Sequence, residues 1–209
     1  GRALADRMTE SVQARNPNAE PAVCHVLDLS SMLPEDLMGM PDTKDVNDNG
    51  DRVTKYIPQS WMASLSREDA YGVFILDDLP AASSQVQTAC RQVSLERRIH
   101  EVKLSPGIVV LVTGNRRGDG ASATTLPSHF RNSVVLIEFE PDFKGWSKWY
   151  MDRGLESDIP AFLLWKQDHF SRLPKDADSK GAFATPRSWA MLGDIVPAIH
   201  PDRLDEFAS

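Results

Sequence analysis

The sequence predicts an α/β fold, in which helices cover a parallel sheet and a smaller helical lobe follows. Strand-like apolar runs alternate with helical segments along the first two thirds of the chain. The run over residues 72–80 carries apolar or small residues directly into Asp77 and Asp78. A continuous apolar run of this length is typical of a strand buried on both faces, as in parallel sheets. After Pro141 the pattern becomes helical and rich in aromatic residues, which predicts a separate lobe.

The composition limits the classes of function. The 209 residues, 41% of them hydrophobic, suffice for one sizeable core, or for one core and a small second lobe. The net charge is -7 and there is no long basic run, so nucleic acid is not the expected partner. Cys24 and Cys90 form no CxxC motif, and the histidines lack metal-ligand spacing. No stretch could span a bilayer and no signal peptide is present, so we expect a cytoplasmic protein without a membrane partner.

The first 60 residues contain a helix, a strand and a long irregular stretch. We expect a helix over residues 2–15 and a strand over residues 23–29. The stretch 31–60 is rich in proline and glycine, and Asn49–Gly50 is a hairpin turn signal with a returning strand over residues 53–57. It is either a long surface loop or a protruding functional insert, and function is at least as well supported because structureless loops of this length are uncommon in compact domains.

The remaining elements follow from periodicity and capping. Ser83 or Ser84 is a suitable N-cap for the helix after the 73–79 strand, and Thr185 and Pro186 mark a clear helix start in the lobe. The aromatic residues of the lobe are expected to fill its core. The elements expected after residue 60 and before the lobe are a strand over 73–79, a helix over 82–98, an edge strand or hairpin arm over 100–104, and buried strands over 108–113 and 134–139.

Polar residues follow two of the predicted strands where each strand ends. In open α/β sheets ligands bind at the carboxyl ends of the strands. One carboxylate of Asp77 and Asp78 could hold Mg²⁺, and the other could orient or deprotonate a water. Asn115 follows the 108–113 strand, and its amide could position a water beside them if the two strands are neighbours. The alternatives are a solvated turn after Asp78 and a turn role for Asn115.

Two further features concern phosphate recognition. Residues 118–123 fit the glycine pattern of a dinucleotide fingerprint, but Thr-Thr-Leu-Pro follows instead of a helix, so we expect a mobile loop. Arg187 lies in the first turn of the helix capped by Thr185, where its guanidinium could reach a phosphate. The alternative is a surface arginine paired with a nearby acid.

Together these motifs resemble an AAA+ ATPase, and nearly the whole chain is similar to the MoxR-type branch. The order and spacing of the motifs carry the resemblance. Residues 74–79 resemble the Walker B strand, 110–116 the sensor 1 strand, 185–189 the sensor 2 helix of the lid, 33–39 the insert in helix 2, 80–89 the helix after Walker B, and 126–132 the segment leading to the arginine finger.

The resemblance implies a parallel-sheet P-loop NTPase-like (AAA+) core over residues 1–141, with an insert at about 31–60 and a small C-terminal helical lid over residues 142–209. It implies ATP and Mg²⁺ as cofactors, and a ring oligomer, usually a hexamer, that acts on a protein substrate or adaptor.

The resemblance also implies a role for individual residues. Asp77 would hold Mg²⁺, and Asp78 would polarise the attacking water. Asn115 would be sensor 1, and Arg187 would be sensor 2. Arg131 would be the finger arginine, offsetting transition-state charge in a neighbouring subunit.

Three departures from the family pattern shape the functional hypotheses. Family members often carry Glu where this chain has Asp78, and the usual finger position is Ser133, which leaves Arg131, Arg116 or Arg117 as the finger. No G-x-x-x-x-G-K-[ST] loop is present, so we expect the natural chain to continue upstream of Gly1 and supply that loop and the first strand, which an intact-mass measurement of the gene product would check.

The leading hypothesis is an ATP-hydrolysing remodeller or chaperone of a protein partner. The alternative is a catalytically weak scaffold or nucleotide-sensing subunit of a larger assembly. The excess of acidic over basic residues disfavours a third hypothesis, a DNA-associated AAA+ protein.

Overall fold

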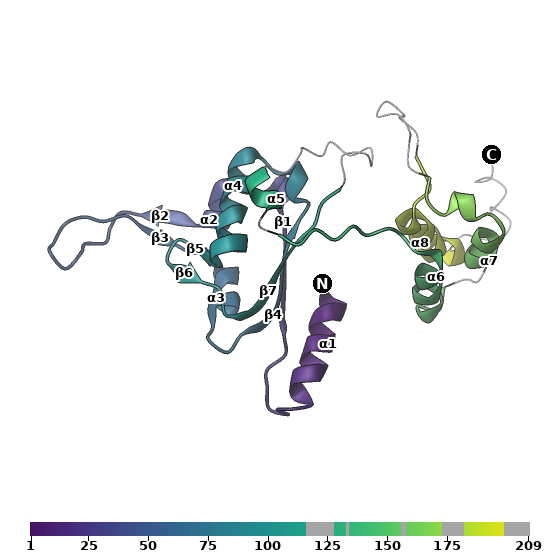
Figure 1. Cartoon of the computed structure of the whole chain (residues 1–209), viewed down its shortest axis with the longest axis horizontal. Helices are drawn as coiled ribbons and strands as arrows, with labels where there is room; N and C mark the ends of the chain where they lie inside the picture. The colour runs from purple at the N-terminus through teal and green to yellow at the C-terminus, as the bar shows by residue number, and fades with distance from the viewer. Residues whose placement is uncertain (116–127, 133, 156–157, 173–181, 199–209) are drawn as a thin grey trace. The chain divides into compact units, whose positions relative to one another are not determined.

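A computed structural model describes residues 1–115, 128–132, 134–155, 158–172 and 182–198 of the chain (Figure 1). The described residues before residue 137 form one compact unit, and those from 137 onward form another. We refer to them as the sheet unit and the helical unit. None of the described helices combines the length and the apolar character that a membrane crossing requires.

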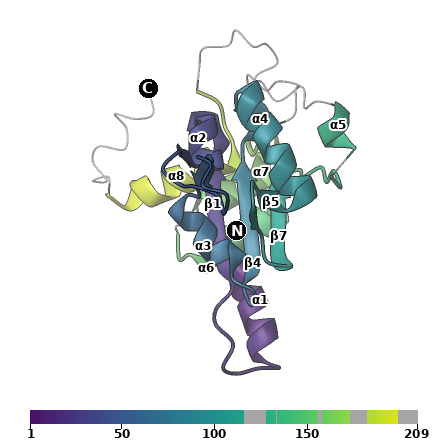
Figure 2. The same ribbon diagram turned by 90° about the vertical axis from the view of Figure 1, so that its left-hand side faces the viewer.

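The sheet unit is built on a parallel three-stranded sheet, as predicted. Its order is β1 (Val23–Asp28), β4 (Tyr71–Asp77) and β7 (Gly107–Val112), with β4 in the middle (Figure 2). Asp28 pairs with Asp77, and Leu76 pairs with Val112. The three strands therefore end at one edge of the sheet, which we call the carboxyl-end edge.

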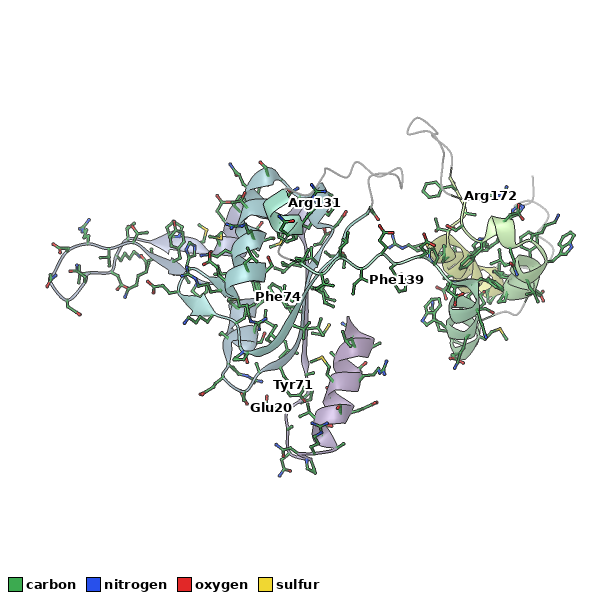
Figure 3. All side chains as sticks on the ribbon, in the orientation of Figure 1. Glu20, Tyr71, Phe74, Arg131, Phe139 and Arg172 are labelled. Atoms are coloured by element: carbon green, nitrogen blue, oxygen red, sulfur yellow. The ribbon has the colours of Figure 1, made fainter. Side chains whose placement is uncertain are left out.

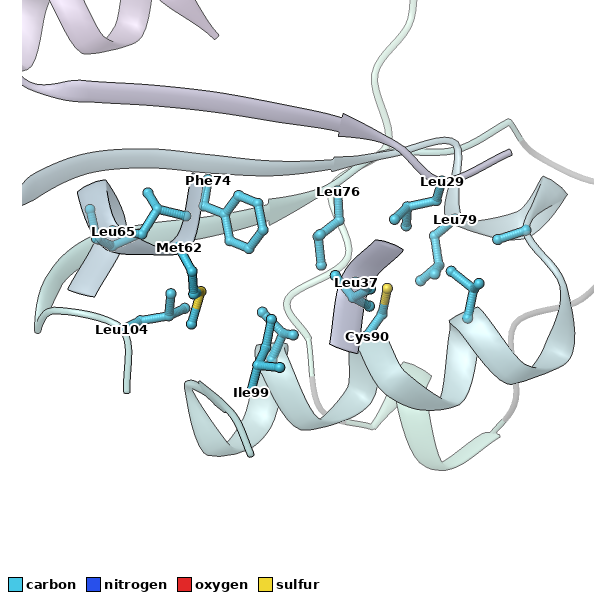
Figure 4. Close-up of a cluster of buried hydrophobic side chains, with 14 of the residues drawn as sticks. Leu29, Leu37, Met62, Leu65, Phe74, Leu76, Leu79, Cys90, Ile99 and Leu104 are labelled. Atoms are coloured by element: carbon cyan, nitrogen blue, oxygen red, sulfur yellow. The ribbon is translucent and has the colours of Figure 1, made fainter. Parts of the chain in front are cut away.

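Helices lie on both faces of this sheet, but they cover the faces unequally. On one face, Phe74 and Leu76 are fully buried beneath α2 (Pro34–Met38), α3 (Ser60–Ser66) and α4 (Ser84–Arg91), as Figure 4 shows. On the other face, α1 (Arg2–Gln13) packs against β1 and β4. On this second face three side chains remain partly exposed, namely Val26 at 50%, Val109 at 45% and Leu111 at 36%.

The helix predicted over residues 82–98 is shorter than expected. Ser83 caps it as predicted, because its hydroxyl accepts the Val86 N–H at 3.3 Å. Regular α4 ends at Arg91, a π-helical segment occupies Gln92–Glu96, and Arg97 then adopts a left-handed φ of 52° that stops the helix. The chain continues into a hairpin of β5 (Arg98–Ile99) and β6 (Val102–Lys103), which confirms the hairpin arm predicted there.

The stretch 31–60 contains a protruding hairpin, as the Asn-Gly signal predicted. Its strands, β2 (Met40–Asp42) and β3 (Lys55–Ile57), pair antiparallel, and the tip extends to the left in Figure 1. Gly50 takes a φ of 82° in the tip, a conformation that glycine adopts without steric cost. The returning strand begins at Lys55 instead of residue 53, after an isolated bridge between Val46 and Arg52.

The strand predicted over residues 134–139 is wrong. The described residues 134–140 have no regular structure, and four of their apolar side chains are 74–89% exposed: Val135, Leu136, Ile137 and Phe139. Among the described residues β7 pairs only with β4, so no neighbouring strand is in place to pair with this segment. An apolar run forms a strand only where its backbone finds a partner.

The helical unit contains α6 (Phe143–Asp152), α7 (Asp158–Trp165) and α8 (Pro186–Ile195). Thr185 caps α8 as predicted, because its hydroxyl accepts the Ser188 N–H at 3.1 Å, and Pro186 takes the first helical position. The predicted aromatic core is found in part. Buried Tyr150 and Phe170 lie at its centre with Trp146 and Trp189 against them, whereas Trp149 and Trp165 are exposed.

Candidate active site

The carboxyl-end edge joins the ends of β4 and β7 through Thr113. The Thr113 hydroxyl donates a hydrogen bond to Oδ1 of Asp77 and accepts one from the backbone N–H of Asp78 at 3.2 Å. Its backbone N–H donates to the carbonyl of Leu76 at 3.0 Å, and its carbonyl accepts from the N–H of Leu79 at 3.1 Å. Four hydrogen bonds therefore tie Thr113, the residue directly after β7, to the end of β4 and to the turn that follows it.

The turn after β4 is sharply bent at Asp78. This residue has φ 55° and ψ 43°, a left-handed conformation that aspartate tolerates better than most residues. The bend sends Leu79 and Pro80 into buried positions and leaves the Asp78 side chain half-buried at the edge. Gly114 fits closely here, because an added Cβ would lie 2.2 Å from Cδ of Pro80.

Asn115 stands at the same edge as the two carboxylates. The expected proximity of Asn115 to the carboxylates depends on β4 and β7 being neighbours, and β7 pairs with β4 along the whole length of β7. Asn115 follows Thr113 by two residues, and both Asn115 and Asp77 are exposed. The edge can therefore present two carboxylates and one amide to a ligand, although the catalytic roles assigned to Asp77, Asp78 and Asn115 stay predictions.

Asp28 is a third carboxylate at this edge that sequence reasoning did not single out. It is the register partner of Asp77 on the neighbouring strand. Its Oδ1 accepts hydrogen bonds from the Ser30 N–H at 3.1 Å and the Ser30 hydroxyl at 2.6 Å. The signal was an aspartate at the end of the strand predicted over residues 23–29, but the same pattern also occurs in ordinary turns.

The donor set suits a hard cation that keeps much of its own water. Among the residues that the structure describes, no three or more His, Cys, Asp or Glu side chains gather closely enough to hold a metal by themselves. Mg²⁺ is usually bound by one or two carboxylates together with water and substrate phosphates. Asp77 fits that requirement, since it is exposed and a hydrogen bond to Thr113 orients its carboxylate.

The start of α1 adds positive potential toward the same edge. Gly1 lies against the sheet, where an added Cβ would be 2.7 Å from Cδ1 of Ile75, two residues before Asp77. The helix runs from there toward the opposite edge of the sheet (Figure 1). The first amides of a helix lack intrahelical partners and favour anions, so the α1 N-terminus is suited to an anionic group at the carboxyl-end edge.

The two predicted arginines belong to different units. Arg131 is exposed at the end of α5 (Ser128–Arg131) in the sheet unit (Figure 3). The neighbouring Phe130 is buried. Arg187 lies in the first turn of α8 in the helical unit and lines a cavity of about 440 Å³ together with Trp149 and Arg153. The other predicted features, Arg116, Arg117, Ser133 and the loop over residues 118–123, lie outside the described residues.

Comparisons with known proteins give distant structural likenesses. No family model and no curated protein matches the chain. A candidate ATPase of Cytophaga hutchinsonii is 13% identical with a TM-score of 0.37, over 83% of this chain and 45% of its own. NtrX of Brucella abortus is 15% identical with a TM-score of 0.41, over 92% and 46%. A full-length MCM homologue of Methanopyrus kandleri is 12% identical with a TM-score of 0.32, over 92% and 48%.

The chain thus spans about half the length of each of these structures. With likenesses this distant, the residues of the carboxyl-end edge are the evidence from which a function is inferred.

Proposed function

We propose that the chain forms part of an ATP-binding and ATP-hydrolysing AAA+ ATPase of the MoxR type. One observation carries this proposal: Asp77, Asp78 and Asn115 stand together at the carboxyl ends of two adjacent parallel strands. That edge is where open α/β sheets bind nucleotides. The α1 N-terminus, directed toward the same edge, supports an anionic ligand such as a phosphate.

Each residue of the edge has a distinct role in the proposal. Asp77 holds Mg²⁺ through its carboxylate, and the bound ion supplies charge neutralisation for the phosphates. Asp78 orients the attacking water and accepts its proton. The Asn115 amide, which both donates and accepts hydrogen bonds, contacts the terminal phosphate and that water.

We also propose that the arginines and a ring assembly complete the site. Arg187 from α8 reads the nucleotide from the lid, and Arg131 acts as the finger in a neighbouring subunit. Both guanidinium groups belong to exposed residues, as such roles require. The proposal predicts that the complete protein becomes oligomeric when Mg·ATP is added, which light scattering after size-exclusion chromatography measures directly.

The β2–β3 hairpin is the proposed contact with a protein substrate. Met40 and Ile57 face each other across the two strands and are 57% and 56% exposed. The base of the hairpin is fixed, because the Tyr56 ring stacks on His100 with centroids 3.8 Å apart, and Gln59 Nε2 donates to the Glu35 carbonyl at 3.2 Å. A hairpin with a fixed base that exposes an apolar pair is suited to contact an unfolded segment.

Phosphate release by the complete protein tests the proposed reaction. Asp78→Asn and Asn115→Ala should each lower turnover about 100-fold or more, because each removes a group that acts on the attacking water. Asp69→Asn and Asn18→Ala are matched controls, since both replace exposed side chains that precede the amino ends of β4 and β1, and they should leave turnover unchanged. Equal turnover in all four variants would contradict the proposal.

One observation favours a catalytically weak nucleotide-sensing subunit as the second candidate. Asp78 is one methylene shorter than the glutamate that the family often carries, which shortens its reach toward a water. A fluorescent ATP analogue separates the two candidates when it is combined with phosphate release. Binding with background turnover supports the sensing subunit, whereas binding with turnover that Asp78→Asn abolishes supports the enzyme.

A further inference from the structure

Thr113 contacts both carboxylate residues of the proposed site through a single hydroxyl. Its Oγ1 donates a proton to Oδ1 of Asp77 and accepts the N–H of Asp78 at 3.2 Å. A threonine hydroxyl has one proton to donate, and that proton is used on Asp77. The direction of both hydrogen bonds is therefore fixed by chemistry, because a carboxylate accepts and a backbone N–H donates.

The surroundings of Thr113 hold this hydroxyl in place. Its own N–H and carbonyl are bonded to Leu76 and Leu79, on either side of the two aspartates. The β-branched side chain has few rotamers, so the hydroxyl direction follows from the backbone. Gly114 lies so close to Pro80 that a side chain there would collide with it, so the two segments cannot approach each other more closely.

We propose that Thr113 is a positioning residue for the metal-holding carboxylate. Its hydrogen bond to Oδ1 restrains the rotation of the Asp77 carboxylate and leaves Oδ2 as the oxygen that would hold a cation. The same hydroxyl holds the left-handed backbone of Asp78, so the metal-holding group and the water-orienting group keep one fixed geometry. This inference rests on the proposed function, and it adds a residue that acts through Asp77 and Asp78 without touching the nucleotide.

Thr113 also lies close in sequence to Asn115, the third residue of the proposed site. Thr113 and Asn115 are separated by Gly114 alone, and Gly114 is in close contact with Pro80. Loss of the hydroxyl should weaken metal binding in addition to slowing turnover.

The test compares Thr113→Val, which keeps the shape and loses the hydroxyl, with Thr113→Ser, which keeps the hydroxyl. Binding of Mn²⁺ with an ATP analogue to the complete protein is measured by electron paramagnetic resonance. Second-sphere groups of metal sites typically contribute 10–100-fold in affinity, so Thr113→Val should raise the Mn²⁺ dissociation constant about tenfold or more. Thr113→Ser should restore it to within about threefold of wild type.

A purely structural role for Thr113 would lower the melting temperature without changing Mn²⁺ affinity in the folded protein, and that result would overturn the inference. Thr113→Ala replaces Thr113→Val if the latter does not fold. Failure of the proposed function has a different signature, because wild type itself would then bind no Mn²⁺ with the nucleotide. Wild-type binding that Asp77→Asn abolishes and Thr113→Val leaves intact would overturn this inference alone.

Discussion

Polar groups lie at both ends of the β4–β7 pair, but those at the amino end are bonded to backbone carbonyls and those at the carboxyl end are exposed. At the amino end Ser105 is 3% exposed, and its hydroxyl donates to the Ala70 carbonyl at 2.5 Å. Arg97 Nη2 donates to the carbonyls of Ser105 and Ile108 at 2.8 and 2.7 Å. At the carboxyl end Asp77 and Asn115 are exposed.

This difference separates a structural role from a ligand-binding role. The amino-end groups donate hydrogen bonds to backbone carbonyls in buried or partly buried surroundings, so they contribute to folding stability. The carboxyl-end groups retain exposed oxygens and an exposed amide, so they are available to a ligand. Substitutions at the two ends should therefore affect different measurements.

Arg97→Ala should have the largest effect on stability. It removes two charge-assisted hydrogen bonds to carbonyl oxygens and should lower the free energy of unfolding by about 3 kcal/mol, measured by urea denaturation. The adjacent Arg98→Ala is the matched control. It removes an ion pair with Glu96 at 2.7 Å between partly exposed side chains and a single hydrogen bond to the His100 carbonyl at 3.0 Å, so the loss should be smaller, about 1 kcal/mol. Similar losses in both variants would contradict the assigned role of Arg97.

Ser105→Ala should have the next largest effect, because the Ala70 carbonyl and the Gly107 N–H lose their bonds to its hydroxyl. The expected loss is about 1–2 kcal/mol in the same denaturation experiment. Ser66→Ala, an exposed hydroxyl bonded to the Ala63 carbonyl at 3.4 Å, should stay within about 0.5 kcal/mol of wild type. If Ser105→Ala and Ser66→Ala lower the free energy of unfolding equally, the buried hydrogen bonds of Ser105 do not contribute the expected stability.

Asp77→Asn should leave the free energy of unfolding within about 0.5 kcal/mol of wild type, since the residue is exposed and asparagine can still accept from Thr113. The chemical denaturation curve gives this value without any ligand. A loss as large as that of Arg97→Ala would show that the carboxyl-end edge is structural, and would remove the distinction between the two ends.

The smallest effect concerns His25, which stacks on Trp61 and lies near Phe74, with ring centroids 5.3 and 6.0 Å away. Burial lowers the pKa of its imidazole below the ordinary value of 6.5. The unfolded chain therefore binds the proton more readily, and stability present above pH 6.5 should be lost as the pH falls below it. As the pH is lowered below 6.5, the melting temperature should decrease more steeply in wild type than in His25→Phe. Equal slopes of melting temperature against pH in the two proteins would contradict this.

Sequence reasoning located the strand ends and helix caps but not the strand partners. The run into Asp77 and Asp78, the Ser83 and Thr185 caps and the Asn49–Gly50 turn depend on neighbouring residues, so local patterns predicted them. The 134–139 run had the composition of a strand, yet strand formation depends on a partner strand elsewhere in the chain, which composition does not specify.

Other features of the site also depend on the fold. Helix α3 was not predicted, because its seven residues give too short a period to recognise. The pairing of Asp28 with Asp77 joins two strands, and the hydrogen bond between Thr113 and Asp77 joins the residue after β7 to the end of β4. Only the strand order and register bring these residues together.

The most direct test of the account is whether the complete protein binds Mn²⁺ in a nucleotide-dependent manner through Asp77. Electron paramagnetic resonance titrations with an ATP analogue would compare wild type with Asp77→Asn and with Asp69→Asn, the latter replacing an exposed carboxylate just before the opposite end of β4. The account predicts binding in wild type and Asp69→Asn and its loss in Asp77→Asn. No binding in wild type, or undiminished binding in Asp77→Asn, would contradict it.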